Sequence, residues 1–214
     1  MKKFDLLIFD LDGTLVDTAR DIFFAVNYAL QKHNLNKTDE ISVINSIGDG
    51  AKQLFEKVIP PEMNEKIDSI VEAYFEYYSK HLLDNTHLYS DVENILCHYN
   101  NKLKVVISNK THKFTKIILK ELNIIKHFRI VLGATVLEKN KPDPLPLNFV
   151  MHKLKIKPEN TIIIGDGIND ILAGKNAGVK VCSVTYGYTK KEKLLEFNPD
   201  YIIDSIAELK NIIY

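Results

Sequence analysis

The chain has 214 residues, which is long for one compact domain and short for two, and this favours one domain with a smaller insertion. Its composition is 45% hydrophobic and 26% charged, which excludes a disordered or collagen-like chain. Lys plus Arg and Asp plus Glu number 28 each. The resulting net charge of zero gives no support for a nucleic-acid-binding protein, which normally has a basic excess.

The sequence also predicts where the protein resides. Cys97 and Cys182 lie far apart and form no CxxC pair, so we expect neither a disulfide framework nor a structural zinc site. The first apolar run covers only residues 6–9, which is too short for a signal peptide, and no run of about 18 apolar residues predicts a membrane span. We therefore expect a cytoplasmic protein without nucleic-acid or membrane partners. We also expect a monomer or a homodimer, although nothing in the sequence chooses between the two.

Short apolar runs alternate with amphipathic segments along most of the chain. Strands are predicted over residues 4–9, 103–107, 130–132, 161–164, 179–184 and 201–203. Helices are predicted over residues 91–99, 113–122, 144–154, 168–177 and 205–213. This alternation is typical of βαβ units. The predicted class is α/β, with three layers in which helices cover both faces of a parallel sheet.

Residues 16–87 interrupt this alternation, because they show no strand pattern. Helices are predicted there over residues 20–33, 51–58 and 63–83. A crossover between parallel strands needs only about a dozen residues, so the excess predicts a separate all-helical subdomain. We assign residues 1–15 and 88–214 to the core and residues 16–87 to the helical insertion.

Carboxylates follow two of the predicted strands at the edge where open parallel sheets bind ligands. Asp10 and Asp12 follow the first strand and can point to the same side of an extended segment, whereas Asp166 and Asp170 follow the fourth. Two unit charges about 4 Å apart repel by about 4 kcal/mol at an effective dielectric constant of about 20. A cluster of four carboxylates therefore predicts a divalent cation, and oxygen ligands with room for water suit Mg²⁺.

Other groups at the same edge suit phosphoryl chemistry. A carboxylate beside a metal can act as a nucleophile toward phosphorus. Ser108 offers a hydroxyl group, the backbone N–H groups near Asn109 and Gly13 can hold phosphate oxygens, and Lys141 supplies a positive charge. Asp12 can protonate the leaving oxygen and then deprotonate water.

Four ordered motifs resemble those of the haloacid dehalogenase superfamily of aspartate-nucleophile phosphatases. They are FDLDGT at residues 9–14, SNK at 108–110, KPDP at 141–144 and GDGIND at 165–170. Within the superfamily, the segments 9–30, 46–55 and 185–188 look most like the phosphoglycolate phosphatase subgroup. The resemblance covers essentially the whole chain. It implies a Rossmann-like core and a mobile helical cap, formed by residues 16–87, that closes over a small phosphorylated metabolite, first of all 2-phosphoglycolate.

The resemblance also implies roles for individual residues. Asp10 would be the nucleophile and Asp12 the acid and base, while Ser108 and Lys141 would bind the phosphoryl group. The expected Mg²⁺ ligands are Asp10, the Asp12 backbone carbonyl and Asp166, with Asp170 acting directly or through water. The expected substrate-binding residues are Gly13, Thr14, Asn109, Arg20 and Gly48. Residues 47–50 form either a helix-start turn or a loop that reaches the site, and Arg20 either binds a substrate carboxylate or is a solvated charge.

Other reactions of the superfamily fit less well. Dehalogenases and phosphonatase-like members lack the second aspartate, and the presence of Asp12 opposes both, although Lys52 invites the phosphonatase interpretation. A β-phosphoglucomutase-like enzyme keeps both aspartates and stays open as an alternative. A non-catalytic phosphate-binding protein on the same fold is a further alternative, against which the intact motifs argue.

Overall fold

The computed structural model describes residues 2–214, and its centre is a six-stranded sheet with the order β5-β4-β1-β6-β7-β8. All neighbouring strands in it pair in parallel. The strands are β1 (Leu6–Phe9), β4 (Leu103–Thr111), β5 (Ile130–Ala134), β6 (Thr161–Gly165), β7 (Lys180–Val184) and β8 (Tyr201–Ile203). The predicted α/β class with a parallel sheet is confirmed.

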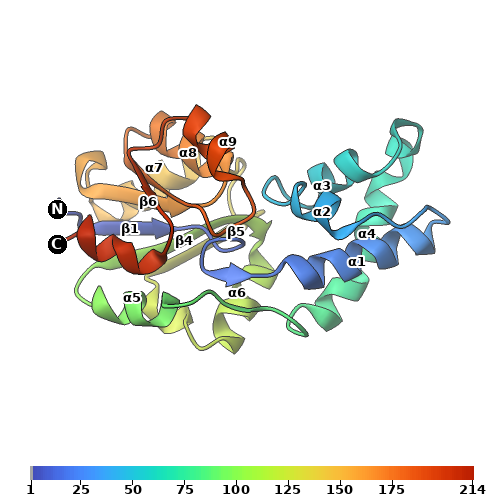
Figure 1. The fold of residues 1–214 in the computed structure, drawn as a ribbon, viewed down its shortest axis with the longest axis horizontal. Helices are drawn as coiled ribbons and strands as arrows, with labels where there is room; N and C mark the ends of the chain where they lie inside the picture. Colours follow the sequence, from blue (N-terminus) through green and yellow to red (C-terminus); the bar gives the residue numbers. More distant parts are fainter. Residues whose placement is uncertain (1) are drawn as a thin grey trace.

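Helices cover both faces of this sheet, as Figure 1 shows. The core helices are α5 (Val92–His98), α6 (His112–Glu121), α7 (Leu145–Leu154), α8 (Ile168–Asn176) and α9 (Lys191–Glu196), with the 3-10 segment η4 at Ile206–Asn211. Successive side chains of a strand point to opposite faces. Leu7 and Phe9 of β1 therefore pack in the cluster with α5, α6 and η4, whereas Leu6 and Ile8 pack in the cluster with α7, α8 and α9.

The insertion extends from one end of the core and consists mainly of helices (Figure 1). They are α1 (Ala19–Lys32), α2 (Glu40–Ile44), α3 (Ala51–Val58), the 3-10 segment η1 (Pro61–Lys66) and α4 (Ile67–His81). Two short antiparallel strands, β2 (Val16–Asp17) and β3 (His87–Leu88), join it to the core. The sequence predicted no strand here, because two residues are too few to show an alternating pattern. The assigned boundaries of the insertion fall at this ribbon.

Several helices differ from the sequence prediction. The helix expected over residues 63–83 is divided into η1 and α4, since Pro61 begins the 3-10 segment. The C-terminal helix is the 3-10 segment η4, and the short helices α2 and α9 were not predicted. Within residues 2–214, no helix combines the length and the apolar composition that crossing a membrane requires.

Candidate active site

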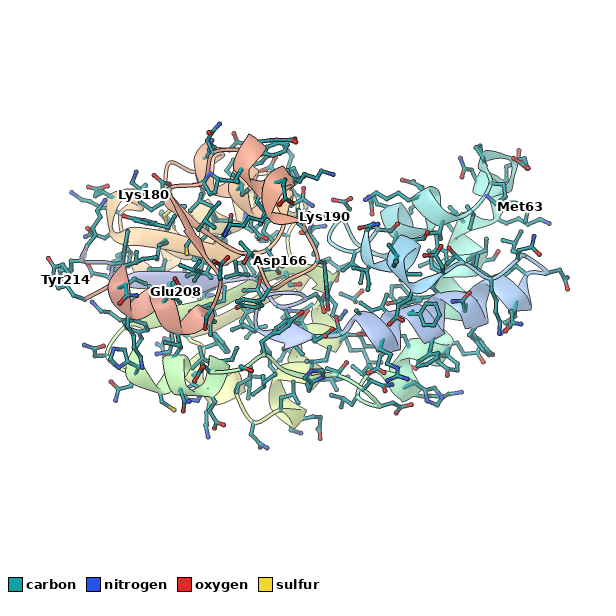
Figure 2. All side chains as sticks on the ribbon, in the orientation of Figure 1. Met63, Asp166, Lys180, Lys190, Glu208 and Tyr214 are labelled. Carbon is teal, nitrogen blue, oxygen red and sulfur yellow. The ribbon has the colours of Figure 1, made fainter. Side chains whose placement is uncertain are left out.

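Three carboxylates meet at the carboxyl ends of β1 and β6, which are adjacent strands of the sheet. Phe9 pairs with Ile164, and the Asp10 N–H donates to the Ile164 carbonyl at 2.9 Å. Asp10, Asp166 and Asp170 each offer an oxygen atom, and these atoms lie within 4.8 Å of one another. Asp166 lies on the side of the core that faces the insertion (Figure 2). The structure therefore brings the two predicted acidic motifs together.

Lys141 is the buried cation of this cluster, with 1% of its side chain exposed. Its Nζ lies 3.0 Å from Asp10 Oδ1 and 2.6 Å from Asp170 Oδ1. Burial alone would lower the pKa of Lys141, but the carboxylates of Asp10 and Asp170 raise it above its ordinary value. Lys139, the neighbouring lysine, is instead exposed and pairs with Asp143 at 3.0 Å. Of these two lysines, Lys141 is thus the one that faces the site.

The single positive charge of Lys141 does not balance the negative charge of the three buried carboxylates. Burial raises the pKa of Asp10, and Asp170 and Asp166 raise it further, although Lys141 opposes them. Burial and the charge of Asp170 raise the pKa of Asp166 to about 7. A divalent cation would stabilise these groups in their ionised form, and a set of carboxylate oxygens is what Mg²⁺ and similar hard cations prefer. The residues present therefore fit such an ion.

The Asp166 carboxylate is held in place from both sides. The Thr14 hydroxyl donates to its Oδ1 at 2.9 Å, and the Tyr188 N–H donates to its Oδ2 at 2.8 Å. Gly13 has a φ of 80°, and a Cβ atom there would lie 2.3 Å from Asp166 Oδ2. The fully buried Thr14 hydroxyl therefore contacts Asp166, an expected metal ligand.

Asp12 is oriented by two groups that contact the same oxygen. The Thr18 hydroxyl donates to Asp12 Oδ1 at 2.6 Å, and Lys110 Nζ lies 3.1 Å from that atom. Within residues 2–214, no hydrogen bond ends on Asp12 Oδ2. This second oxygen is therefore the one available to a leaving group or a water molecule.

A loop of the insertion contacts both core loops of the site. The Asn109 side chain donates to the Gly48 carbonyl at 2.9 Å and to the Lys141 carbonyl at 2.8 Å. The Asn169 side chain donates to the Asp49 carboxylate at 2.5 Å and to the Gly48 carbonyl at 3.3 Å. Residues 47–50 therefore reach the site and also lead into a helix, because Gly50 is the N-cap residue of α3.

Two cavities flank this loop, and both are lined by Asp10, Asp12 and Gly48. We call the first the acidic chamber; its volume is about 230 Å³, and it contains Asp166 and Asp170. We call the second the cap chamber; its volume is about 50 Å³. The remaining walls of the cap chamber include Ser108, Asn109, Lys110, Ile22, Leu54, Tyr74, Phe75, Tyr78 and Phe114. The site thus has a charged half and a largely apolar half.

Two basic residues considered from the sequence lie apart from the site. Arg20 is exposed, and its guanidinium group lies 5.8 Å from the centre of the Phe24 ring. Lys52 is also outside both chambers and pairs with Asp68 at 2.9 Å. The structure therefore does not bring Arg20 together with the other expected substrate-binding residues.

The sequence did not single out several residues that shape the site. They are Thr18, Lys110, Asn169, Tyr186 and Tyr188. Lys110, Asn169 and the two tyrosines all lie within recognised motifs, so their positions were visible. The residues that they contact could not be predicted, because each of these contacts joins two residues that are far apart along the chain.

Comparison with known proteins identifies the family. Residues 7–184 match the family model for haloacid dehalogenase-like hydrolases. The chain belongs to this family. The predicted superfamily and the predicted Rossmann-like core are thereby confirmed, and so is the expected enzyme class, a phosphatase of the haloacid dehalogenase type.

Individual relatives match over their full length. A phosphoglycolate phosphatase of Vibrio parahaemolyticus is 33% identical, with 97% of this chain and 95% of that protein covered. A phosphoglycolate phosphatase of Haemophilus influenzae is 32% identical, with 99% of each chain covered. The crystal structure of a predicted phosphoglycolate phosphatase from Haemophilus somnus superposes with a TM-score of 0.93 at 30% identity, covering 99% of each chain.

Proposed function

We propose that the protein is a Mg²⁺-dependent phosphomonoester hydrolase that forms an aspartyl-phosphate on Asp10, with 2-phosphoglycolate as its first candidate substrate. The observation that carries the proposal is the position of Asp10. Its carboxylate lies 3.0 Å from Lys141 Nζ and within the same 4.8 Å cluster as Asp166 and Asp170. Phosphoryl transfer chiefly requires that the nucleophile is positioned and that phosphate charge is neutralised, and here Lys141 and a cation held by the carboxylates would supply the positive charge.

The first half-reaction uses Asp10 and Asp12 in turn. A carboxylate oxygen of Asp10 forms a bond to phosphorus while the bond from phosphorus to the ester oxygen breaks. Asp12 gives its proton to that oxygen, which leaves as an alcohol. Lys141, the Ser108 hydroxyl and nearby backbone N–H groups hold the phosphoryl oxygens. Bound Mg²⁺ would supply neutralising charge at the phosphoryl group, with Asp10, the Asp12 carbonyl and Asp166 as its ligands and Asp170 in support.

The second half-reaction restores the enzyme. Asp12, now ionised, takes a proton from a water molecule whose oxygen attacks the phosphorus of the aspartyl-phosphate. The bond between phosphorus and the Asp10 oxygen breaks, and inorganic phosphate leaves. The two halves together consume one water molecule and release one alcohol and one phosphate.

Two observations support a small substrate. The acidic chamber and the cap chamber have volumes of about 230 and 50 Å³, whereas ligand sites typically measure about 300–1,000 Å³. The relatives named phosphoglycolate phosphatase are aligned with the whole chain. A small chamber argues against the β-phosphoglucomutase-like alternative, because a hexose is larger than glycolate. The intact acidic cluster argues against a non-catalytic binding protein.

The test is a phosphate-release assay on a panel of phosphorylated metabolites, with Mg²⁺ or with EDTA. We expect 2-phosphoglycolate to rank among the best substrates, with activity lost in EDTA and restored by Mg²⁺. Phosphate release that persists unchanged in EDTA would contradict the metal requirement. Turnover of a sugar phosphate that depends on a sugar bisphosphate and releases no phosphate would instead establish the mutase. A cytoplasmic location and a monomeric or homodimeric state stay predictions.

A further inference from the structure

Lys110 has a largely buried side chain that the steps above do not use. It lies near the end of β4, and only 7% of its side chain is exposed. Its Nζ is 3.1 Å from Asp12 Oδ1 and 4.9 Å from the centre of the Tyr78 ring. Among the described residues that line the cap chamber, Lys110 is the only cation. The apolar half of the site therefore contains a single positive charge.

Orienting Asp12 does not by itself explain this lysine. The Thr18 hydroxyl already holds the same Asp12 oxygen at the shorter distance of 2.6 Å. Burying an ammonium group carries a large desolvation penalty, and an ion pair offsets it only when further partners are present. The Lys110 ammonium group pairs with the Asp12 carboxylate and lies over the face of the Tyr78 ring. A second anion bound in the chamber would further offset the cost of burying this charge.

The geometry of the reaction shows where such an anion would lie. Asp12 must reach the ester oxygen at hydrogen-bond distance, about 2.7 Å, to protonate it. In 2-phosphoglycolate one methylene group separates that oxygen from a carboxylate, so the carboxylate oxygens lie roughly 3 Å from it. Lys110 Nζ lies 3.1 Å from Asp12 Oδ1, on the side of the cap chamber. The ammonium group is therefore within reach of that carboxylate.

We propose that Lys110 determines substrate specificity by binding a carboxylate attached one carbon away from the ester oxygen, an inference that rests on the proposed hydrolase function. Lys141 does not serve this purpose, because Asp10 and Asp170 already engage it. Arg20 and Lys52 do not line the chamber. A single cation among apolar walls suits a carboxylate better than a second phosphate, which carries more charge and more acceptor oxygens.

Two substrates of equal length test the proposal. 2-Phosphoglycolate carries the carboxylate, and 2-hydroxyethyl phosphate carries a neutral hydroxymethyl group in its place. The measured quantity is the ratio of their kcat/KM values in the wild type, in Lys110→Met and in Lys113→Met. Lys113 is an exposed lysine of α6 and serves as the matched control. Thermal melting in Mg²⁺ checks that each variant is folded, and Lys110→Gln replaces Lys110→Met if the latter does not fold.

We expect the wild type and Lys113→Met to prefer 2-phosphoglycolate. In Lys110→Met both rates can fall, since Asp12 loses a partner, but the preference itself should fall about 10- to 100-fold, the effect of losing a hydrogen bond between charged groups. Lys110→Arg, which keeps the charge, should retain most of the preference. The loss of preference should appear mainly in KM for 2-phosphoglycolate, because the carboxylate contact exists before the transition state.

Two results would overturn the inference while the hydrolase function stands. One is an unchanged ratio in Lys110→Met despite lower rates, which would mean that Lys110 only positions Asp12. The other is a wild type that hydrolyses both esters equally well. If the wild type releases no phosphate from either ester in Mg²⁺, nor from any member of the metabolite panel, the proposed function itself fails and the inference fails with it.

Discussion

The ammonium nitrogen of Lys141 lies 3.0 Å from a carboxylate oxygen of Asp10, and only 1% of the Lys141 side chain is exposed to solvent. Lys141 reaches this position from the loop between β5 and α7, whereas Asp10 follows β1. The contact therefore joins two loops at the carboxyl edge of the sheet. The charge balance of the site depends on this pair and on the carboxylates of Asp166 and Asp170.

Replacing Lys141 with methionine should reduce kcat by about 10²- to 10³-fold, because one fixed positive group that stabilises transition-state charge is lost. The measurement is phosphate release at saturating substrate and Mg²⁺. Lys139→Met is the matched control, since Lys139 is exposed and pairs with Asp143. Its rate should match the wild type. Equal losses in both variants would mean that Lys141 has no special role.

Asp10→Asn should lower phosphate release by at least about 10³-fold, because an amide cannot form the aspartyl-phosphate. The fold should persist. Burial and the neighbouring carboxylates raise the pKa of the Asp10 carboxyl, which means that its ionised form is unfavourable there, and a neutral amide of the same size avoids this cost. An aryl phosphate assay and thermal melting in EDTA measure the two effects. Substantial release of phosphate by a folded Asp10→Asn variant would disprove the assignment of the nucleophile.

Asp12→Asn should slow alkyl phosphates more than aryl phosphates. An alkoxide leaves poorly without a proton, whereas a nitrophenolate needs little help, so the ratio of the two rates reports the proton donated by Asp12. The control variant is Thr18→Val, which removes the hydroxyl that contacts Asp12 Oδ1 but keeps the carboxylate. We expect the rate on alkyl phosphates to fall less in Thr18→Val than in Asp12→Asn. If the rates on the two classes of ester fall equally in Asp12→Asn, the acid role is wrong.

In the metal-free protein, the Asp166 carboxyl should contribute a loss of stability as the pH rises from about 4 to about 7. The pKa of Asp166 is raised to about 7 in the folded chain, against about 3.9 in an unfolded one. Between these values the folded state holds a proton that the unfolded state has lost, so the free energy of unfolding falls by up to about 1.4 kcal/mol per pH unit. Above pH 7 this contribution is constant.

Mg²⁺ should therefore stabilise the protein more at pH 8 than at pH 6, because a bound cation must displace that proton. Melting temperatures in EDTA and in Mg²⁺ across this range give the difference directly. Asp166→Asn should show a smaller Mg²⁺ effect with less dependence on pH. A Mg²⁺ effect that is larger at pH 6 than at pH 8 would contradict the expectation.

The core could be predicted from the sequence because its elements carry local signals. The β1 segment is apolar on both faces and is followed at once by Asp10, and this pattern reports both a buried strand and a site at its end. The ribbon of β2 and β3 could not be predicted, because its two-residue strands exist only through pairing with each other. Helix α2 could not be predicted either, because its five residues are too few to display a helical period.

For the site, the sequence predicted that Asp10, Asp12, Asp166 and Asp170 follow strands whose carboxyl ends share one edge of a parallel sheet. That β1 and β6 are neighbours in this sheet, which brings the two acidic motifs together, is a property of the strand order. Which side chain contacts which was decided only by the tertiary structure. Thr14 contacts Asp166, Lys110 contacts Asp12, and Arg20 lies outside. Such contacts depend on the packing of the cap and of the loops, and separation along the chain carries no information about them.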